Sequence, residues 1–91
     1  MTYMLSRNRV LDFDRWKAVF AADAEAHRAA GLHFEKLWRN VEDPHEIFFL
    51  FAVESVEKAK EFISAPEAAE KGEEAGAVEG EVYFVEEVEG Y

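Results

Sequence analysis

Apolar positions change their period several times along the chain, and each change predicts a new element of secondary structure. Four short segments are rich in aromatic and β-branched residues and are bounded by turn residues, as strands are. These segments span residues 2–10, 32–40, 46–54 and 81–89. Asp43 and Pro44 form a turn signal between the second and third segments, which predicts a hairpin there.

Helical spacing appears first after residue 11. Asp12 is a suitable N-cap, and Gly31 is a natural stop for an alanine-rich helix. The apolar stripe of this single predicted helix consists of Phe13, Trp16, Phe20, Ala24 and His27. The sequence thus predicts one long helix between the first two strands.

A second helical region follows the third strand. Ser55 is its expected N-cap, and its apolar positions are Val56, Ala59, Phe62 and Ile63. A fresh start is expected at Pro66, with Ser64 as a second N-cap and Glu67 completing a capping box. We therefore expect two helical pieces that meet at Pro66 and end near Gly76.

The resulting order β-α-β-β-α-β predicts an α+β protein with a ferredoxin-like fold in one domain, residues 1–91. Right-handed crossovers and the hairpin favour a four-stranded antiparallel sheet with strand order 4-1-3-2. Both helical regions then cover the same face of the sheet. The other face must meet water or a partner.

The third strand indicates which of these applies. An antiparallel strand with one wet face alternates apolar and polar residues, but residues 47–53 are apolar throughout. Both faces of the sheet are therefore expected to be shielded from water. The helices cover one face, and a second copy of the chain in a homodimer covers the other. Burial of two large side chains per protomer there would contribute roughly 3–6 kcal/mol. A monomer with an exposed apolar face is the alternative.

Composition supports a second apolar surface and excludes several functions. Thirteen of the 91 residues are aromatic, more than one small core needs. The net charge is −10, and its excess lies in residues 46–91, which hold thirteen glutamates and three lysines. Such a surface repels phosphate backbones, so no nucleic-acid partner is expected. There is no cysteine and no apolar run of about 20 residues, so we expect no membrane partner and a cytoplasmic location.

With these elements placed, the chain resembles the dimeric α/β-barrel superfamily, and in particular its small antibiotic-biosynthesis-monooxygenase-like proteins. The resemblance spans nearly the whole chain and rests on residues 12–17, 30–32, 43–46, the Phe-rich third strand and 64–67. It implies two sheets packed face to face in a dimer, with a pocket between sheet and helices in each subunit. Members include cofactor-independent oxygenases, isomerases, haem-degrading enzymes and proteins without known activity.

One branch of that superfamily is disfavoured by the residues themselves. Asn8, Arg9 and Val10 are similar to the Asn-Arg-Leu of the haem-degrading branch, in which the Asn lines the site. That branch also carries a Trp and a His ten positions apart in the second helical region. The corresponding residues here are Phe62 and Gly72, so we expect no haem degradation and no cofactor.

The first strand breaks the apolar pattern of a central strand, and such breaks concentrate at functional sites. By alternation Ser6, Asn8 and Val10 share one face, and Arg7 and Arg9 share the other. If Val10 packs under the first helix, Ser6 and Asn8 face a helix-covered cavity, although Asn8 could also be a satisfied buried amide. The arginines would line the barrel interior or, preferably, pair with acids of the last strand, namely Glu86, Glu87 or Glu89.

A small-molecule site is usually an apolar pocket with a few polar groups. The residues expected to line one here are Ser6, Asn8, Trp16, Phe20, Phe34, Trp38, Phe49 and Tyr83. Each aromatic residue taken singly could equally belong to the core or the dimer interface.

The three histidines are His27, His33 and His45, and their spacing matches no helical metal motif, so no metal is expected. His45 lies in a turn and is expected to be solvated. The candidates for a catalytic role are Asn8 and a general base, either His27 or His33, because an imidazole titrates near neutral pH. No nucleophile elbow, phosphate loop or dinucleotide fingerprint is present.

Three functions remain. The first is a dimeric barrel that binds a small aromatic or apolar metabolite between sheet and helices. The second is a cofactor-independent monooxygenase, isomerase or cyclase that acts on a phenolic or polyketide-like compound. The third is a structural or regulatory dimer without a ligand, whose acidic half contacts a basic partner.

Overall fold

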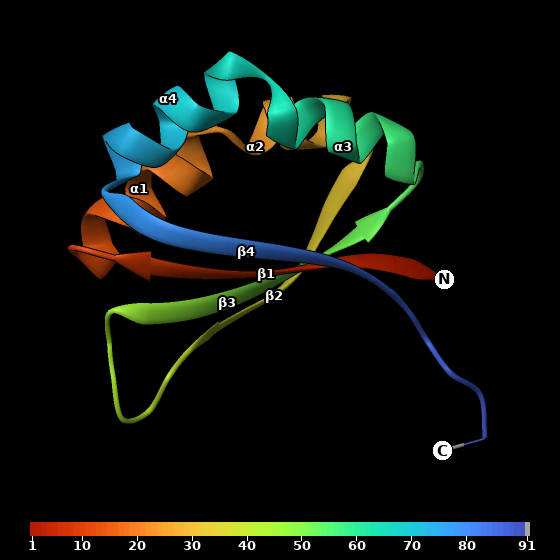
Figure 1. Ribbon diagram of the computed structural model, residues 1–91, viewed down its shortest axis with the longest axis horizontal. Helices are drawn as coiled ribbons and strands as arrows, with labels where there is room; N and C mark the ends of the chain where they lie inside the picture. The colour runs from red at the N-terminus through yellow and green to blue at the C-terminus, as the bar shows by residue number, and fades with distance from the viewer. Residues whose placement is uncertain (91) are drawn as a thin grey trace.

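Four strands form a single antiparallel sheet in the computed structural model, which describes residues 1–90 (Figure 1). The strands are β1 (Thr2–Val10), β2 (Leu32–Arg39), β3 (Glu46–Val53) and β4 (Ala77–Glu86), and the helices are α1 (Phe13–Ala22), α2 (Ala24–Ala29), α3 (Val56–Ser64) and α4 (Pro66–Ala75). The strand order is β2-β3-β1-β4, the predicted order read from the other edge. Because all four helices cover one face, the ferredoxin-like fold is confirmed (Figure 1).

Side-chain caps begin two of the helices as the sequence predicts. The Asp12 carboxylate accepts a hydrogen bond of 3.1 Å from the backbone N–H of Arg15. The Ser55 hydroxyl accepts one of 3.2 Å from the backbone N–H of Lys58. Gly76 ends α4 with a φ of 76°, a conformation that a glycine adopts at no steric cost.

The helical regions depart from expectation at two joints. The first region is broken at Asp23 into α1 and α2, although a single helix was predicted. The Asp23 N–H bonds to the carbonyl of Phe20 rather than to that of Val19, so the last turn tightens. The second joint falls at Pro66 as predicted, but Ala65 is the N-cap and Ser64 ends α3. The predicted capping box is therefore wrong.

The last strand begins four residues earlier than predicted and ends at Glu86 rather than at residue 89. Glu79 and Gly80 have low strand propensity, which places the predicted start too late. Pairing with the long central strand β1 overrides that propensity, because β4 pairs with it from Val10 opposite Ala77 to Thr2 opposite Glu86.

The hydrophobic core lies between the sheet and the helices. On β3 the residues Ile47, Phe49 and Phe51 point toward the helices and are buried. Phe48 and Leu50 point the other way and are half-buried, although none of the described helices covers that face (Figure 1). Within residues 1–90 no helix is long and apolar enough to cross a membrane.

The arginines of β1 form ion pairs on the outer sheet face. Arg7 donates to Glu46 at 2.6 Å and to Glu81 at 3.0 Å, and Arg9 donates to Asp43 at 2.7 Å. Cross-strand pairing was expected, but with the wrong acids, namely Glu86, Glu87 or Glu89. The register explains the error, because Glu86 lies opposite Thr2 at the far end of β1, and Glu87 and Glu89 follow the end of β4.

Candidate functional site

An inner cavity of about 160 Å³ lies between the sheet and the helices. The central strand β1 contributes three of its lining residues, Met4, Ser6 and Asn8. The other lining residues come from the facing helices and strands: Trp16, Val19, Phe20, Asp23, His27, Leu32, Phe49, Phe51, Phe62, Ile63, Lys71, Gly72, Ala75 and Val82. The alternation of β1 thus turns Ser6 and Asn8 toward the helices.

Ser6 is the buried polar residue of the core. Its exposed fraction is 2%, and its Oγ has no hydrogen-bond partner within residues 1–90. Buried hydroxyls are almost always hydrogen-bonded, because an unpaired one costs about 1–3 kcal/mol of desolvation. Ser6 therefore presents an unsatisfied donor and acceptor to a cavity whose lining is mostly apolar.

Asn8 lies next to Ser6 on the same face and opposite Gly80 of β4. A Cβ added at Gly80 would lie 3.0 Å from Asn8 Oδ1. The missing side chain at residue 80 therefore leaves room for the Asn8 amide at the cavity wall. This close approach accounts for a glycine inside a strand.

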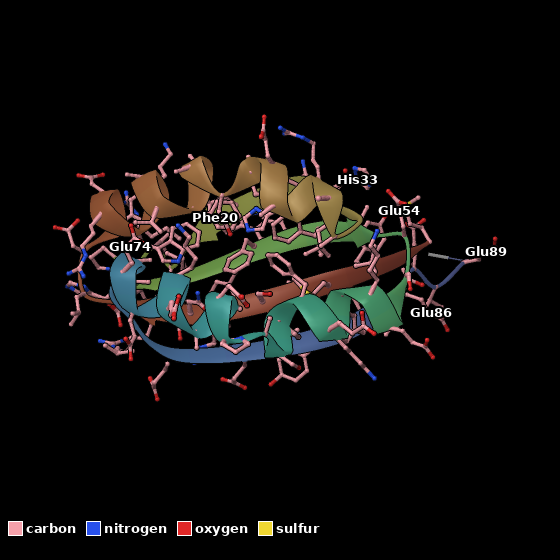
Figure 2. All side chains as sticks on the ribbon, turned by 90° about the horizontal axis from the view of Figure 1, so that it is seen from above. Phe20, His33, Glu54, Glu74, Glu86 and Glu89 are labelled. Carbon is pink, nitrogen blue, oxygen red and sulfur yellow. The ribbon has the colours of Figure 1, made fainter. Side chains whose placement is uncertain are left out.

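Aromatic rings form the wall beside these polar groups. Trp16 and Phe20 stack with their ring centroids 4.6 Å apart, and both rings lie about 5 Å from Phe49, at 5.4 and 5.2 Å. Phe51 joins the same cluster, 5.8 Å from Phe20. Seen from above, Phe20 lies at the inner edge of the α1–α2 pair, over the sheet (Figure 2).

His27 reaches the cavity from α2 and lies among aromatic rings, with centroids 5.0 Å from Phe20, 5.1 Å from Phe51 and 5.7 Å from Phe62. Its Nε2 lies 3.4 Å from Asp23 Oδ2, one helical turn earlier. Burial lowers the pKa of His27 below its ordinary value of 6.5, and the Asp23 charge opposes this only in part. At neutral pH the imidazole is therefore uncharged and can accept a proton.

A second, larger hollow of about 540 Å³ adjoins the inner cavity. Phe20, His27 and Phe51 line both spaces. The remaining residues of this outer hollow come from α1, α2 and β2: Lys17, Ala21, Ala24, Arg28, His33, Phe34 and Leu37.

The structure brings together six of the predicted site residues in the inner cavity: Ser6, Asn8, Trp16, Phe20, His27 and Phe49. Phe34 and His33 line the outer hollow instead. The His33 imidazole is half-exposed and pairs with Glu54, away from Phe20 (Figure 2).

Trp38 and Tyr83 do not line either space. Trp38 lies opposite Phe48 and Tyr83 opposite Leu5, so the register places both on the outer sheet face. Their exposed fractions are 46% and 52%, and the Tyr83 hydroxyl donates to Glu81, which raises the pKa of Tyr83. The prediction that Trp38 and Tyr83 face the helix-covered pocket is therefore wrong, because successive strand residues point to opposite faces and these two point outward. A bulge in β2 between Phe34 and Lys36 puts the two aromatic residues of that strand on opposite faces.

Several lining residues were missed by sequence reasoning. Asp23 carries a signal that was available, because it precedes His27 by four positions, the spacing of neighbours on a helix face. The residues of α4, Lys71, Gly72 and Ala75, carry no such signal. Gly72 and Phe62, the two residues compared with the haem-degrading branch in the sequence, both line the cavity.

Comparison with known proteins supports the fold. No protein-family model and no curated protein sequence matches the chain. Among solved structures it is similar to the "putative antibiotic biosynthesis monooxygenase" of Bordetella bronchiseptica, with 18% identity, 96% of each chain covered and a TM-score of 0.78. A protein of the same description from Deinococcus radiodurans has 9% identity over 100% of this chain and 96% of its own, with a TM-score of 0.68.

A NIPSNAP domain protein from Burkholderia xenovorans shares the architecture at 8% identity, with coverage of 98% and 96% and a TM-score of 0.67. At such identities the likeness concerns the fold. The chain thus has the ferredoxin-like fold of antibiotic-biosynthesis-monooxygenase-like proteins, as the resemblance of its sequence implied.

Proposed function

We propose that the chain binds a small aromatic or otherwise apolar molecule in the inner cavity, held by one hydrogen bond to Ser6. The unpartnered Ser6 hydroxyl, in a residue that is 2% exposed and lines a mostly apolar cavity, is the observation that carries this proposal. A bound oxygen or nitrogen would satisfy it at the site where water is least available. Asn8 supplies a second polar group on the same strand face.

The volume of the cavity limits the size of the ligand. An apolar cavity of about 150 Å³ accommodates a benzene ring, and the inner cavity measures about 160 Å³. A single-ring compound with a hydroxyl or carbonyl group therefore fits better than a polycyclic one. Of the substrates considered from the sequence, a phenolic compound is favoured over a polyketide-like compound.

The test is a titration of the protein with phenol, toluene and cyclohexanol, in which the fluorescence of Trp16 reports binding. Trp38→Phe removes the second tryptophan from the outer face, so that the signal reports the cavity alone. We expect saturable binding of phenol, weakened about fivefold in Ser6→Ala because one hydrogen bond contributes about 1 kcal/mol.

Ser64→Ala, on the exposed end of α3, removes the same kind of hydroxyl from a residue that does not line the cavity and should leave the affinity unchanged. Equal affinity of Ser6→Ala and the unchanged protein for phenol, or no saturable binding of any of the three compounds, would contradict the proposal.

A second candidate is an enzyme that needs no cofactor and begins by removing a proton from its substrate. His27 and Asn8 line the same cavity, and the imidazole of His27 is uncharged at neutral pH and oriented by Asp23. His27 would take a proton from a carbon next to a carbonyl group, while Ser6 and Asn8 bind the carbonyl oxygen that gains charge in the enolate. NMR measures the rate at which that proton exchanges for deuterium. This rate should be higher with the unchanged protein than with His27→Gln. Equal rates would exclude His27 as the base.

The outer sheet face supports a homodimer. Its apolar side chains are Tyr3, Leu5, Trp38, Phe48, Leu50, Tyr83 and Val85. Contiguous apolar surface of this kind marks an interaction site. We propose that a second copy of the chain covers it, with the ion pairs of Arg7 and Arg9 at one end of the interface. A structural or regulatory dimer without a ligand would use the same face and leave the cavity without a role.

A further inference from the structure

The outer hollow differs from the rest of this acidic chain in its charge. Its floor is apolar, with Phe34, Leu37 and Phe51, and its charged lining residues are Lys17 and Arg28. None of its ten lining residues is acidic, although the chain carries a net charge of −10. A basic lining of this kind attracts negative ligands, which the acidic excess of the chain otherwise repels.

The two cations are available to a ligand. Neither Lys17 nor Arg28 forms an ion pair within residues 1–90, even though Asp14 and Glu25 each lie one helical turn before them. His33, at the end of the hollow, is already paired with Glu54 (Figure 2). An anion in the hollow could therefore pair with either cationic group without displacing an existing partner.

The outer hollow is continuous in its lining with the inner cavity. Phe20, His27 and Phe51 line both spaces, so the two spaces adjoin at these three side chains, which a substituent of a ring seated beside Ser6 would have to pass. The inner cavity holds one ring, and the hollow, at about 540 Å³, holds a flexible arm of several atoms.

We propose that the ligand is a single-ring aromatic compound with a short anionic arm, its ring in the inner cavity and its carboxylate or phosphate between Lys17 and Arg28. This inference rests on the proposed function and adds the chemical class of the ligand. Arg28 offers planar paired donors and Lys17 a point charge, and both suit either anion. Selection among aromatic compounds then depends on the charge of the arm.

Three probes that share a phenol ring test the charge of the arm: 3-(4-hydroxyphenyl)propanoate, neutral 4-ethylphenol and cationic tyramine. We expect the anion to bind tightest and the cation weakest. In Lys17→Gln/Arg28→Gln the anion should lose about fivefold in affinity, because exposed ion pairs contribute up to about 1 kcal/mol in total. A phosphate monoester of 2-(4-hydroxyphenyl)ethanol, titrated alongside, shows which anion is preferred.

Lys58→Gln/Lys60→Gln makes the same change in net charge on α3 and serves as the matched control. If the anion loses affinity in this control as well, the effect is one of net charge and the inference is overturned. If 4-ethylphenol binds as well as the anion and the Lys17/Arg28 variant changes neither, the inference fails while the proposed function stands. If none of these probes binds and phenol does not bind either, the proposed function itself fails.

Discussion

Nε2 of His27 lies 3.4 Å from Oδ2 of Asp23, at the joint where the first helical region breaks into α1 and α2. Asp23 follows α1 and precedes α2, so the carboxylate and the imidazole face each other across one turn. Both side chains line the inner cavity with Ser6 and Asn8. The break in the helix therefore belongs to the candidate site.

The buried His27 should make the stability of the fold depend on pH. Its pKa is lowered below 6.5 by burial, so the unfolded chain binds more protons than the folded one between the folded pKa and 6.5. Stability is then complete above pH 6.5 and falls as the pH decreases toward the folded pKa. Urea denaturation between pH 7.5 and 5.5 should show this fall, and it should be shallower in His27→Gln.

His45→Gln is the control, because His45 is exposed in the β2–β3 turn. Asp43 and Glu46, whose pKa values are lowered mainly by hydrogen bonds from Arg9 and Asn40 respectively, lose their contributions only below about pH 4.5. If the free energy of unfolding changes with pH equally in His27→Gln and in the unchanged protein, the prediction is wrong. Folding then does not lower the pKa of His27.

Ser6→Ala should stabilise the fold while it weakens ligand binding. The substitution removes a buried hydroxyl without a partner and keeps the strand and the packing of the Cβ. Removal of such a group is expected to raise the free energy of unfolding by about 1 kcal/mol. Urea denaturation of the ligand-free protein measures it. A loss of stability instead would mean that the hydroxyl is satisfied within the fold.

Two glycines near the cavity should respond oppositely to alanine. In Gly80→Ala the new Cβ meets Asn8 Oδ1 at 3.0 Å, so the amide must shift and phenol affinity should fall several-fold. In Gly72→Ala nothing lies within 4 Å of the new Cβ, and α4 should gain about 1 kcal/mol through helix propensity. Paired measurements of phenol affinity and urea denaturation distinguish the two effects; unchanged affinity in Gly80→Ala would exclude a role for the Asn8 position.

Leu50→Glu should separate the proposed dimer. Leu50 lies at the centre of the outer sheet face, between Leu5 of β1 and Lys36 of β2. Loss of its burial costs about 2 kcal/mol, and the introduced charge adds a desolvation penalty, so dissociation should increase more than about thirtyfold. Sedimentation velocity measures it, with Val41→Glu in the exposed hairpin as the control of equal charge. A protein that is monomeric before any substitution would contradict the dimer.

The pattern of apolar residues was sufficient for the four strands and the two helical regions, because local spacing and caps decide them. The caps at Asp12 and Ser55 and the joint at Pro66 follow from residues close in sequence. The strand order follows from the general rules by which such elements connect. Alternation along β1 was also enough to turn Ser6 and Asn8 toward the helices.

Other features depend on contacts between distant segments, which no local pattern contains. The β2 bulge separates Trp38 from Phe34, the register of β4 selects Glu81 rather than Glu86 as a partner of Arg7, and α4 closes the cavity with Gly72. The sequence by itself determined which residues are apolar, where the chain turns and which strand carries polar groups. Only the tertiary structure decided which of these groups meet, because strand register and helix packing are set by the fit of surfaces far apart along the chain.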